Sequence, residues 1–237
     1  MTHDATKTTY SHNNAQAYLQ LAQTRHSVRA FLPAPVPQPL LETLLHTARL
    51  APSGANLQPG HFWYVQDAAR IRLTDALMHA HRTQQPKRED YAYFPCPMPM
   101  QLRKRQVSAA QALYGSLGIS RGDGAARAQQ FECNYRFFDA PVALIVTISK
   151  DFGSGGFMDL GMTIHNLWMA AHAFGLGACA IGALASYPDV VRQTLGLPSD
   201  AMIVCGMALG YPDTQAPINA TRTERIDLEA YFSVLKD

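Results

Sequence analysis

The sequence predicts an α/β or α+β fold in which helices cover a central sheet. Continuous apolar, β-branched runs at 140–148 and 202–209 are typical of strands buried on both faces. Segments with apolar residues at helical spacing alternate with these runs. A chain of 237 residues can bury a sizeable core in one domain or two small ones. Helices alternating with buried strands give the layered arrangement expected here.

The composition excludes several classes of protein. Hydrophobic residues make up 47% and charged residues 16%, which mildly favours an oligomer that hides surface. A net charge of +2 gives no electrostatic basis for binding nucleic acid. The longest apolar stretch, 167–181, is broken by His172 and glycines, and 1–14 has no apolar signal segment. We therefore expect a cytoplasmic protein with neither membrane nor nucleic-acid partners.

Cysteine and histidine patterns point away from disulfides, metals and nucleophilic catalysis. The four cysteines lack CxxC spacing and are interpreted as reduced thiols: Cys96, Cys133, Cys179 and Cys205. The nine histidines form no HExxH motif, and His165 and His172 have no carboxylate or cysteine at ligand spacing. There is no G-x-S-x-G motif either. We expect no metal site and no catalytic side chain of these kinds.

The first third of the chain reads as a tail followed by three helices and one strand. Residues 1–14 are polar and are expected to form a flexible tail. Prolines and glycines at 51–60 mark a turn cluster. Helices are predicted at 15–22, 37–50 and 68–81, and a strand at 61–65.

A long excursion is predicted at about 84–137. Residues 84–100 contain four prolines and show no periodicity, as is common for lids and binding loops. Helices are expected at 102–117 and 124–137. Apart from this insertion, 15–237 is expected to be a single domain.

The last third contains the predicted core. After the strand at 140–148, a turn is expected at 153–156 and the most apolar helix at 157–174, capped by 175–177. Trp168, in this helix, is expected in the core or at a dimer interface. A strand at 178–183, a helix at 188–195 and the strand at 202–209 follow, and then a polar tail at 218–237.

The run Arg25-His26-Ser27-Val28-Arg29-Ala30-Phe31 is the main candidate for a binding site. Two guanidiniums and a hydroxyl on one short segment suit a phosphate, because guanidinium forks match its oxygens. The alternative is a basic helix end whose cations complement the helix dipole. Glycines at 153–156 do not have G-x-G-x-x-G spacing, so a nucleotide would not be held in a Rossmann crevice.

Other candidate residues are scattered along the chain. Arg222 and Arg225 are cations near the C-terminus, and Ser53, Asn56 and Gln58 can bond heterocycle edges or sugar hydroxyls. Glycine in Ala180-Ile181-Gly182-Ala183 permits a planar ring to approach the backbone closely.

Five motifs in order resemble those of the nitroreductase family. The run at 25–31 is similar to its R-x-S-x-R-x-F motif, and 51–59 (APSGANLQP) to its second signature. Residues 134–141 (NYRFFDAP) resemble N-x-x-F-F-x-A-P, 159–177 resembles the central helix, and 223–225 the closing T-x-R. Together the motifs cover about 200 residues.

The resemblance implies an α+β fold with a central mixed sheet and an intertwined homodimer carrying FMN at the subunit interface. By motif position, the phosphate and ribityl chain would be held by Arg25, His26, Ser27, Arg29 and either Arg222 or Arg225. Asn134 would face the flavin's polar edge, and the backbone of Ala180, Ile181, Gly182 and Ala183 would lie against the isoalloxazine. Pro52, Ser53 and Asn56 would come from the partner subunit.

The implied activity is a ping-pong reaction in which a hydride from NADPH or NADH is passed by FMN to a nitroaromatic or quinone. The flavin carries the chemistry, so no catalytic side chain is expected. The excursion, with Tyr91, Tyr93 and Phe94, would cover the partner's site and stack on a planar substrate. Arg103, Arg105 and Arg121 are candidates for the 2′-phosphate of NADPH.

Two residues depart from the family pattern. His165 stands where glutamine is common, and Ile181 replaces a frequent polar residue, which suggests a drier pocket. These departures leave two alternatives open. One is the same fold with other flavin chemistry: dehalogenation, flavin destruction or ring dehydrogenation. The other is a flavin- or nucleotide-binding module that does not turn over.

Overall fold

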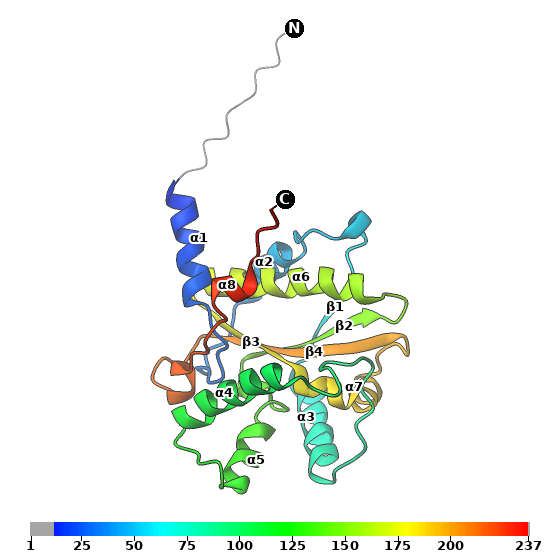
Figure 1. Cartoon of the computed structure of the whole chain (residues 1–237). Helices are drawn as coiled ribbons and strands as arrows, with labels where there is room; N and C mark the ends of the chain where they lie inside the picture. Colours follow the sequence, from blue (N-terminus) through cyan, green and yellow to red (C-terminus); the bar gives the residue numbers. More distant parts are fainter. Residues whose placement is uncertain (1–11, 237) are drawn as a thin grey trace.

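A four-stranded antiparallel sheet organises the computed structural model, which describes residues 12–236. The strand order is β1-β2-β4-β3, so β2 and β4 are central (Figure 1). The strands are β1 (His61–Tyr64), β2 (Val142–Ser149), β3 (Gly177–Ile181) and β4 (Ala201–Gly210).

Helices cover both faces of this sheet (Figure 1). Above it in the view lie α2 (Gln38–Ala48) and α6 (Ser154–Ala173). Below it lie α3 (Asp67–Arg82), α4 (Met100–Ser116), α5 (Gly124–Glu132) and α7 (Pro188–Leu195). α1 (His12–Thr24) projects away from the body, and the short α8 (Leu228–Tyr231) lies near the C-terminus.

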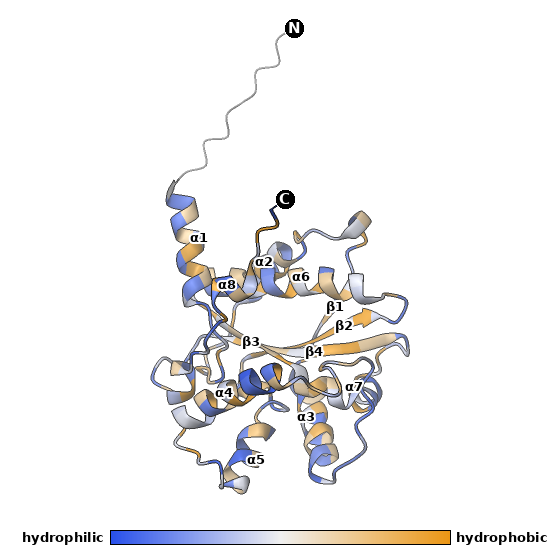
Figure 2. Cartoon of the chain, in the orientation of Figure 1, coloured by the Kyte–Doolittle hydropathy of each residue, from blue (hydrophilic) through white to orange (hydrophobic). Residues whose placement is uncertain are grey.

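The core lies in two layers, one on each face of the sheet. Alternate residues of β2 point to opposite faces, so Leu144 and Val146 join the layer under α2 and α6. Ala143 and Ile145 join the layer that includes α3 and α7. Figure 2 shows the apolar colour concentrated along the strands. The prediction of strands buried on both faces is confirmed for β2 and β4.

The α+β class is confirmed, but the sheet is antiparallel, whereas a mixed sheet with both parallel and antiparallel strands was expected. All pairings among the four strands are antiparallel. The parallel pairing found in the described part of the chain is one isolated bridge, between Ser27 and Ala178.

Several predicted boundaries are wrong by a few residues. Residues 12–14 are helical rather than part of a tail, while 1–11 lie outside the described residues. α6 begins at Ser154, where a turn was expected, because glycine at 156 lets Phe152 pack against the helix start. α5 ends at Glu132, five residues before the expected end at 137. β3 ends at Ile181, and Gly182 begins a 3-10 turn (Gly182–Ser186).

The end of α6 leads the chain directly into β3. Gly175 has φ +76°, a left-handed conformation that glycine adopts without strain. Leu176 N–H donates to Ala171 C=O at 2.8 Å and Gly175 N–H to His172 C=O at 3.0 Å. These two bonds form the Schellman motif, as the predicted glycine cap required.

The segment after α1 runs along the edge of β3. Val28 N–H donates to Ala178 C=O at 3.1 Å, and the Val28 side chain is buried. A Cβ at position 177 would lie 2.5 Å from Val28 Cγ2, so this approach requires glycine there. The arginines on either side of Val28 are therefore fixed relative to the sheet.

Gly177→Ala tests this packing. The added methyl group would force Val28 away from the strand, so we expect a loss of roughly 1–3 kcal/mol in the free energy of unfolding. For a chain of this length, each kcal/mol lowers Tm by about 2–4 °C. Gly115→Ala is the control, because a Cβ there meets nothing within 4 Å and alanine is the better helix former. A Gly177→Ala protein as stable as the wild type would contradict the close approach.

His172 connects α6 to the end of α1. Its Nε2 lies 2.8 Å from Thr24 Oγ1, and His26 Nδ1 is 3.0 Å from Thr24 C=O. Burial lowers the pKa of His172 from its ordinary value, and the charges of His26 and Arg25 lower it further. His172 is therefore held neutral in the folded protein at pH values where the unfolded chain would be protonated.

This pKa shift predicts a dependence of stability on pH. As the pH falls below about 6.5, the unfolded chain binds a proton at His172 before the folded chain does, so stability falls. The loss ends at the lower, folded-state pKa. His172→Asn should show a shallower decline of urea midpoint than the wild type over this window. Equal slopes for the two proteins would show that His172 is not held neutral.

Candidate functional site

The two basic segments predicted to hold phosphate meet in one hollow. Its volume is about 330 Å³, and it lies between the end of α1 and the C-terminal segment. The lining residues are Ala22, Gln23, Arg25, His26, Ser27, Arg29, Thr221, Arg222, Thr223 and Arg225. The structure therefore brings together residues almost 200 positions apart in the sequence. Both C-terminal arginines contribute, although a choice between them was expected.

Asn219, which was not predicted from the sequence, joins the two segments by hydrogen bonds. Its Oδ1 accepts the Arg29 and Ala30 N–H groups at 2.8 and 3.3 Å. Its Nδ2 donates to Ala30 C=O at 2.7 Å and to Asp213 C=O at 2.8 Å. The side chain is buried, so all of its hydrogen-bonding capacity is used inside the protein. A buried amide bonding to backbone has no periodic signal in a sequence.

Among the described residues, no carboxylate forms an ion pair with the four guanidiniums in the hollow. Within residues 12–236, the ion pairs are formed by other arginines, at 82, 136 and 192. Arg222 Nη1 donates to Asn219 C=O at 2.8 Å, and Arg225 Nη1 to Thr223 Oγ1 at 2.9 Å. These neutral acceptors orient the guanidiniums and leave their positive charge uncompensated.

Electrostatics therefore favour an anion in this hollow. Burial lowers the pKa of Arg25 from its ordinary value, and repulsion from Arg225 lowers it further. Burial raises the pKa of the Cys179 thiol, which keeps it neutral, while Arg29 and Ser27 act in the opposite direction. Several guanidiniums converging without a carboxylate fit a phosphate dianion, which accepts bidentate hydrogen bonds from them.

The second signature does not line this hollow. Gly54 N–H donates to Asp159 Oδ2 at 3.0 Å, which ties the 51–59 turn to α6. Ser53 Oγ accepts the Gln58 N–H at 2.9 Å. Pro52 lines a different hollow together with His165 on α6. The structure thus separates Pro52, Ser53 and Asn56 from the arginine hollow of their own chain.

Asn134 is also outside the arginine hollow. Its Nδ2 donates to Phe131 C=O at 2.7 Å, just beyond the end of α5. In this structure it acts as a local cap, which is a common role for asparagine.

The strand end predicted to face the isoalloxazine lies beside the same edge of the sheet. Ala180 is the strand neighbour of Cys179 and is half-buried, while the Ile181 side chain is buried in the layer that includes α7. The expectation that Ile181 makes the pocket drier is therefore wrong, because this side chain belongs to the core. Only its backbone remains as a candidate contact.

Tyr93 covers this strand end from the excursion. The Tyr93 ring lies 3.1 Å from the position that a Cβ on Gly182 would take. Phe94 packs edge-on against Tyr93 with ring centroids 4.7 Å apart, and both side chains are more than half exposed. The excursion was expected to cover the partner's site, but in this chain its aromatics lie against their own sheet.

Polar contacts anchor the excursion just before these aromatics. Asp90 forms an ion pair with Arg192 on α7, with Oδ2 and Nη1 2.6 Å apart, and also accepts the Ile203 N–H at 2.9 Å. Tyr91 Oη donates to Val204 C=O at 2.6 Å. Burial raises the pKa of Tyr91, so its hydroxyl stays protonated as the donor. Tyr93 and Phe94 thus extend from a fixed root.

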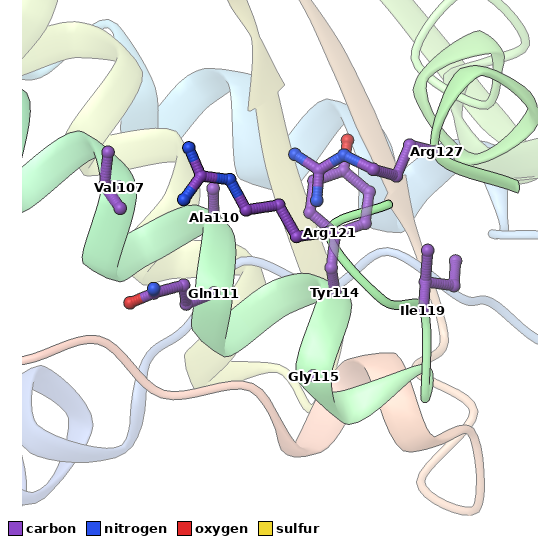
Figure 3. Close-up of a pocket in the computed structure, with 8 residues that line it drawn as sticks. All are labelled: Val107, Ala110, Gln111, Tyr114, Gly115, Ile119, Arg121 and Arg127. Carbon is purple, nitrogen blue, oxygen red and sulfur yellow. The ribbon is translucent and has the colours of Figure 1, made fainter. Parts of the chain in front are cut away.

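Two further hollows on α4 are basic. One shares Thr223 and Arg225 with the arginine hollow and adds Lys104 and Arg105, with Glu224 as its one acidic residue. The other places Arg121 and Arg127 over α4, with Arg127 Cζ 3.8 Å from the centroid of the Tyr114 ring (Figure 3). Of the three expected 2′-phosphate candidates, Arg105 lines the hollow that shares Arg225 with the arginine hollow, and Arg121 lines the other hollow.

Residues 12–236 contain neither a membrane-spanning helix nor a cluster of metal ligands. No helix there has both the length and the apolar character needed to cross a bilayer. No three histidine, cysteine, aspartate or glutamate side chains there are grouped as metal ligands.

Comparison with known proteins agrees with this geometry. A family model described as "Nitroreductase family" matches residues 22–211. The chloronitrobenzene nitroreductase of Comamonas testosteroni is 34% identical over 218 residues, covering 92% of this chain and 96% of its own. The 4-nitrobenzoate reductase of Pseudomonas putida is 34% identical over 202 residues, covering 85% and 88%.

A solved structure has the same fold. It is the FMN- and NADPH-dependent nitroreductase NfnB from Sphigopyxis sp. strain HMH, with a TM-score of 0.89 and 32% identity. The match covers 93% of this chain and 99% of that one. The shared fold, the ordered motifs and the family match over most of the length lead to one conclusion: this chain belongs to the nitroreductase family.

Proposed function

We propose that the protein is an FMN-dependent oxidoreductase that takes a hydride from NAD(P)H and reduces nitroaromatic compounds. One observation carries the cofactor assignment: four guanidiniums converge in a hollow, and none of them forms an ion pair with a carboxylate of residues 12–236. An FMN phosphate supplies the missing negative charge. The similar proteins named as nitroreductases support the reaction class.

The phosphate of FMN would be held by Arg25, Arg29, Arg222 and Arg225. His26 and Ser27 line the same hollow and would bond the ribityl chain. When bound, FMN supplies the hydride chemistry, which no side chain of the protein can replace. The protein's contribution is to bind and orient it. Positioning and a fixed electrostatic environment are the usual roles of a protein around a redox cofactor.

We propose a planar aromatic acceptor. Tyr93 and Phe94 present exposed rings beside the end of β3, where a flat molecule can stack on them. The relatives from Comamonas testosteroni and Pseudomonas putida are named for chloronitrobenzene and 4-nitrobenzoate. Both compounds are flat rings bearing a nitro group.

We also propose that the working unit is a homodimer. Pro52, Ser53 and Asn56 carry a family signature yet lie apart from their own arginine hollow, as expected if they serve the partner's site. Exposed apolar side chains in α1 and the C-terminal segment favour burial in an assembly: Tyr18, Leu19, Leu228, Tyr231, Phe232, Val234 and Leu235. Asn134 stays a proposed flavin contact, because its bond to Phe131 uses one of the two N–H donors of Nδ2 and leaves Oδ1 able to accept.

The domain organisation and location follow as proposals. Residues 15–237 would form one domain, with 84–137 as a cover whose root is fixed by Asp90 and Tyr91. A cytoplasmic location suits four free cysteines. For the hydride donor we favour NADPH, because Lys104 and Arg105 extend the basic surface beyond the FMN phosphate.

Anaerobic spectroscopy tests the function. The purified protein should be yellow and should lose its flavin absorbance when NADPH is added, faster than with NADH. Adding 4-nitrobenzoate should restore the oxidised spectrum, and steady-state turnover should follow. A protein that takes up no FMN would contradict the proposal. Bleaching without turnover on nitroaromatics or quinones would favour other flavin chemistry, and no bleaching would favour a binding module.

Replacing a phosphate arginine tests the site. Arg25→Gln removes one charge-assisted pair, worth on the order of 1.5–3 kcal/mol, so FMN should bind about 10- to 100-fold more weakly. Arg103→Gln is the control, because Arg103 is not among the residues that line the arginine hollow. Equilibrium dialysis measures both. Equal FMN affinity for Arg25→Gln and Arg103→Gln would place the phosphate elsewhere.

A further inference from the structure

Trp168 of α6 supports one arginine of the hollow. The Arg25 Cζ atom lies 4.6 Å from the centroid of the Trp168 ring. Tryptophan is the best aromatic partner for a cation, and the attraction grows as the pair is withdrawn from water. Both side chains are half-buried. Trp168 was expected in the core or at a dimer interface, and the structure adds its contact with Arg25, which lines the arginine hollow.

The surroundings of Arg25 disfavour its positive charge. Burial and the charge of Arg225 both act against its positive charge, as the lowered pKa indicates. No carboxylate in the described part of the chain lies within ion-pair distance of it. The negative face of the indole is therefore the group that offsets this charge before an anion arrives.

The same face of α6 also fixes the backbone beside Arg25. His172 is four residues after Trp168, which places both side chains on one side of the helix. His172 Nε2 lies 2.8 Å from Thr24 Oγ1, in the residue directly before Arg25. Two contacts with α6 thus fix the position of Arg25. His172 contacts the preceding residue, Thr24, and Trp168 contacts the Arg25 guanidinium.

We propose that Trp168 is a positioning residue for the cofactor phosphate: its indole face holds the Arg25 guanidinium in the hollow, ready to bind the phosphate. The identity of the anion rests on the proposed function, whereas the contact itself is a feature of the fold. Because the effect acts through Arg25, it concerns the phosphate and leaves the flavin ring untouched.

Comparing FMN with riboflavin separates this role from a general structural one. Riboflavin has the same ring and ribityl chain but no phosphate. Trp168→Leu should weaken FMN binding about five- to tenfold, the range expected for a partly buried cation–π contact, and leave riboflavin affinity unchanged. Trp168→Phe keeps an aromatic face and should restore most of the FMN affinity.

The matched control is Trp63→Phe. Trp63 is the other of the two tryptophans, and its Nε1 donates to Thr147 Oγ1 within the sheet at 2.9 Å, away from the hollow. It should change neither affinity. Equal weakening of FMN and riboflavin by Trp168→Leu would show a merely structural role and overturn the proposal. Unchanged FMN affinity in both Trp168 variants would overturn it as well.

Fluorescence of Trp168 gives a second readout that does not depend on flavin. In full-length Trp63→Phe protein freed of flavin by dialysis, Trp168 is the one indole. Inorganic phosphate should change its emission in a saturable way that chloride at equal ionic strength does not reproduce. Absence of any phosphate effect would contradict the proposal. If phosphate acts while wild-type protein binds no FMN, the proposed function fails and the positioning of an anion by Trp168 stands.

Discussion

The constraint on which this structure depends is a group of four like charges that no carboxylate in the described part of the chain neutralises. Bringing guanidiniums into one hollow costs free energy, because they repel each other and lose water. Contacts with neutral groups of the protein offset part of this unfavourable free energy. Asn219 joins the chain near residue 30 to the C-terminal segment by hydrogen bonds from both ends of its amide. The Trp168 ring faces Arg25, and backbone carbonyls accept from Arg222.

Such an arrangement is a preorganised binding site for an anion. The arginines are oriented before a ligand arrives, so little conformational entropy remains to be lost on binding. The sheet contributes to this order, since Val28 packs over Gly177 and fixes the arginines at 25 and 29 to the edge of β3. The position of the phosphate relative to the β3 end then follows from covalent geometry and packing, which is how a protein orients a cofactor that carries the chemistry.

Much of the fold could be predicted from the sequence, because its signals are local. The β-branched run at 142–149 and the helix at 188–195, with proline at its start and glycine after its end, were found within a residue or two. Boundaries failed where a tertiary contact decided them. The glycines at 153–156 read as a turn, but Phe152 packing against Gly156 lets the helix start there.

The site was only partly predictable for the same reason. Arg25, Arg29 and Arg225 were found because motifs mark them, Arg222 was found as a cation beside the last motif, and the structure brings all four together. Asn219, Trp168 and the contact of Tyr93 with Gly182 were not found as site features, since each depends on residues distant in sequence. Ile181 was assigned to the pocket, but strand alternation places its side chain in the core.

Phosphorus NMR of the FMN complex tests the central claim, that uncompensated arginines hold the cofactor phosphate as a dianion. The second pKa of a free phosphate monoester is about 6, so the resonance of free FMN moves as the pH is changed around that value. In the hollow, the four guanidiniums should hold the bound phosphate dianionic. Its resonance should therefore stay at the dianion position from about pH 5.5 to 8. A bound resonance that titrates like free FMN would contradict the account, because it would show the phosphate in solvent, away from the arginines.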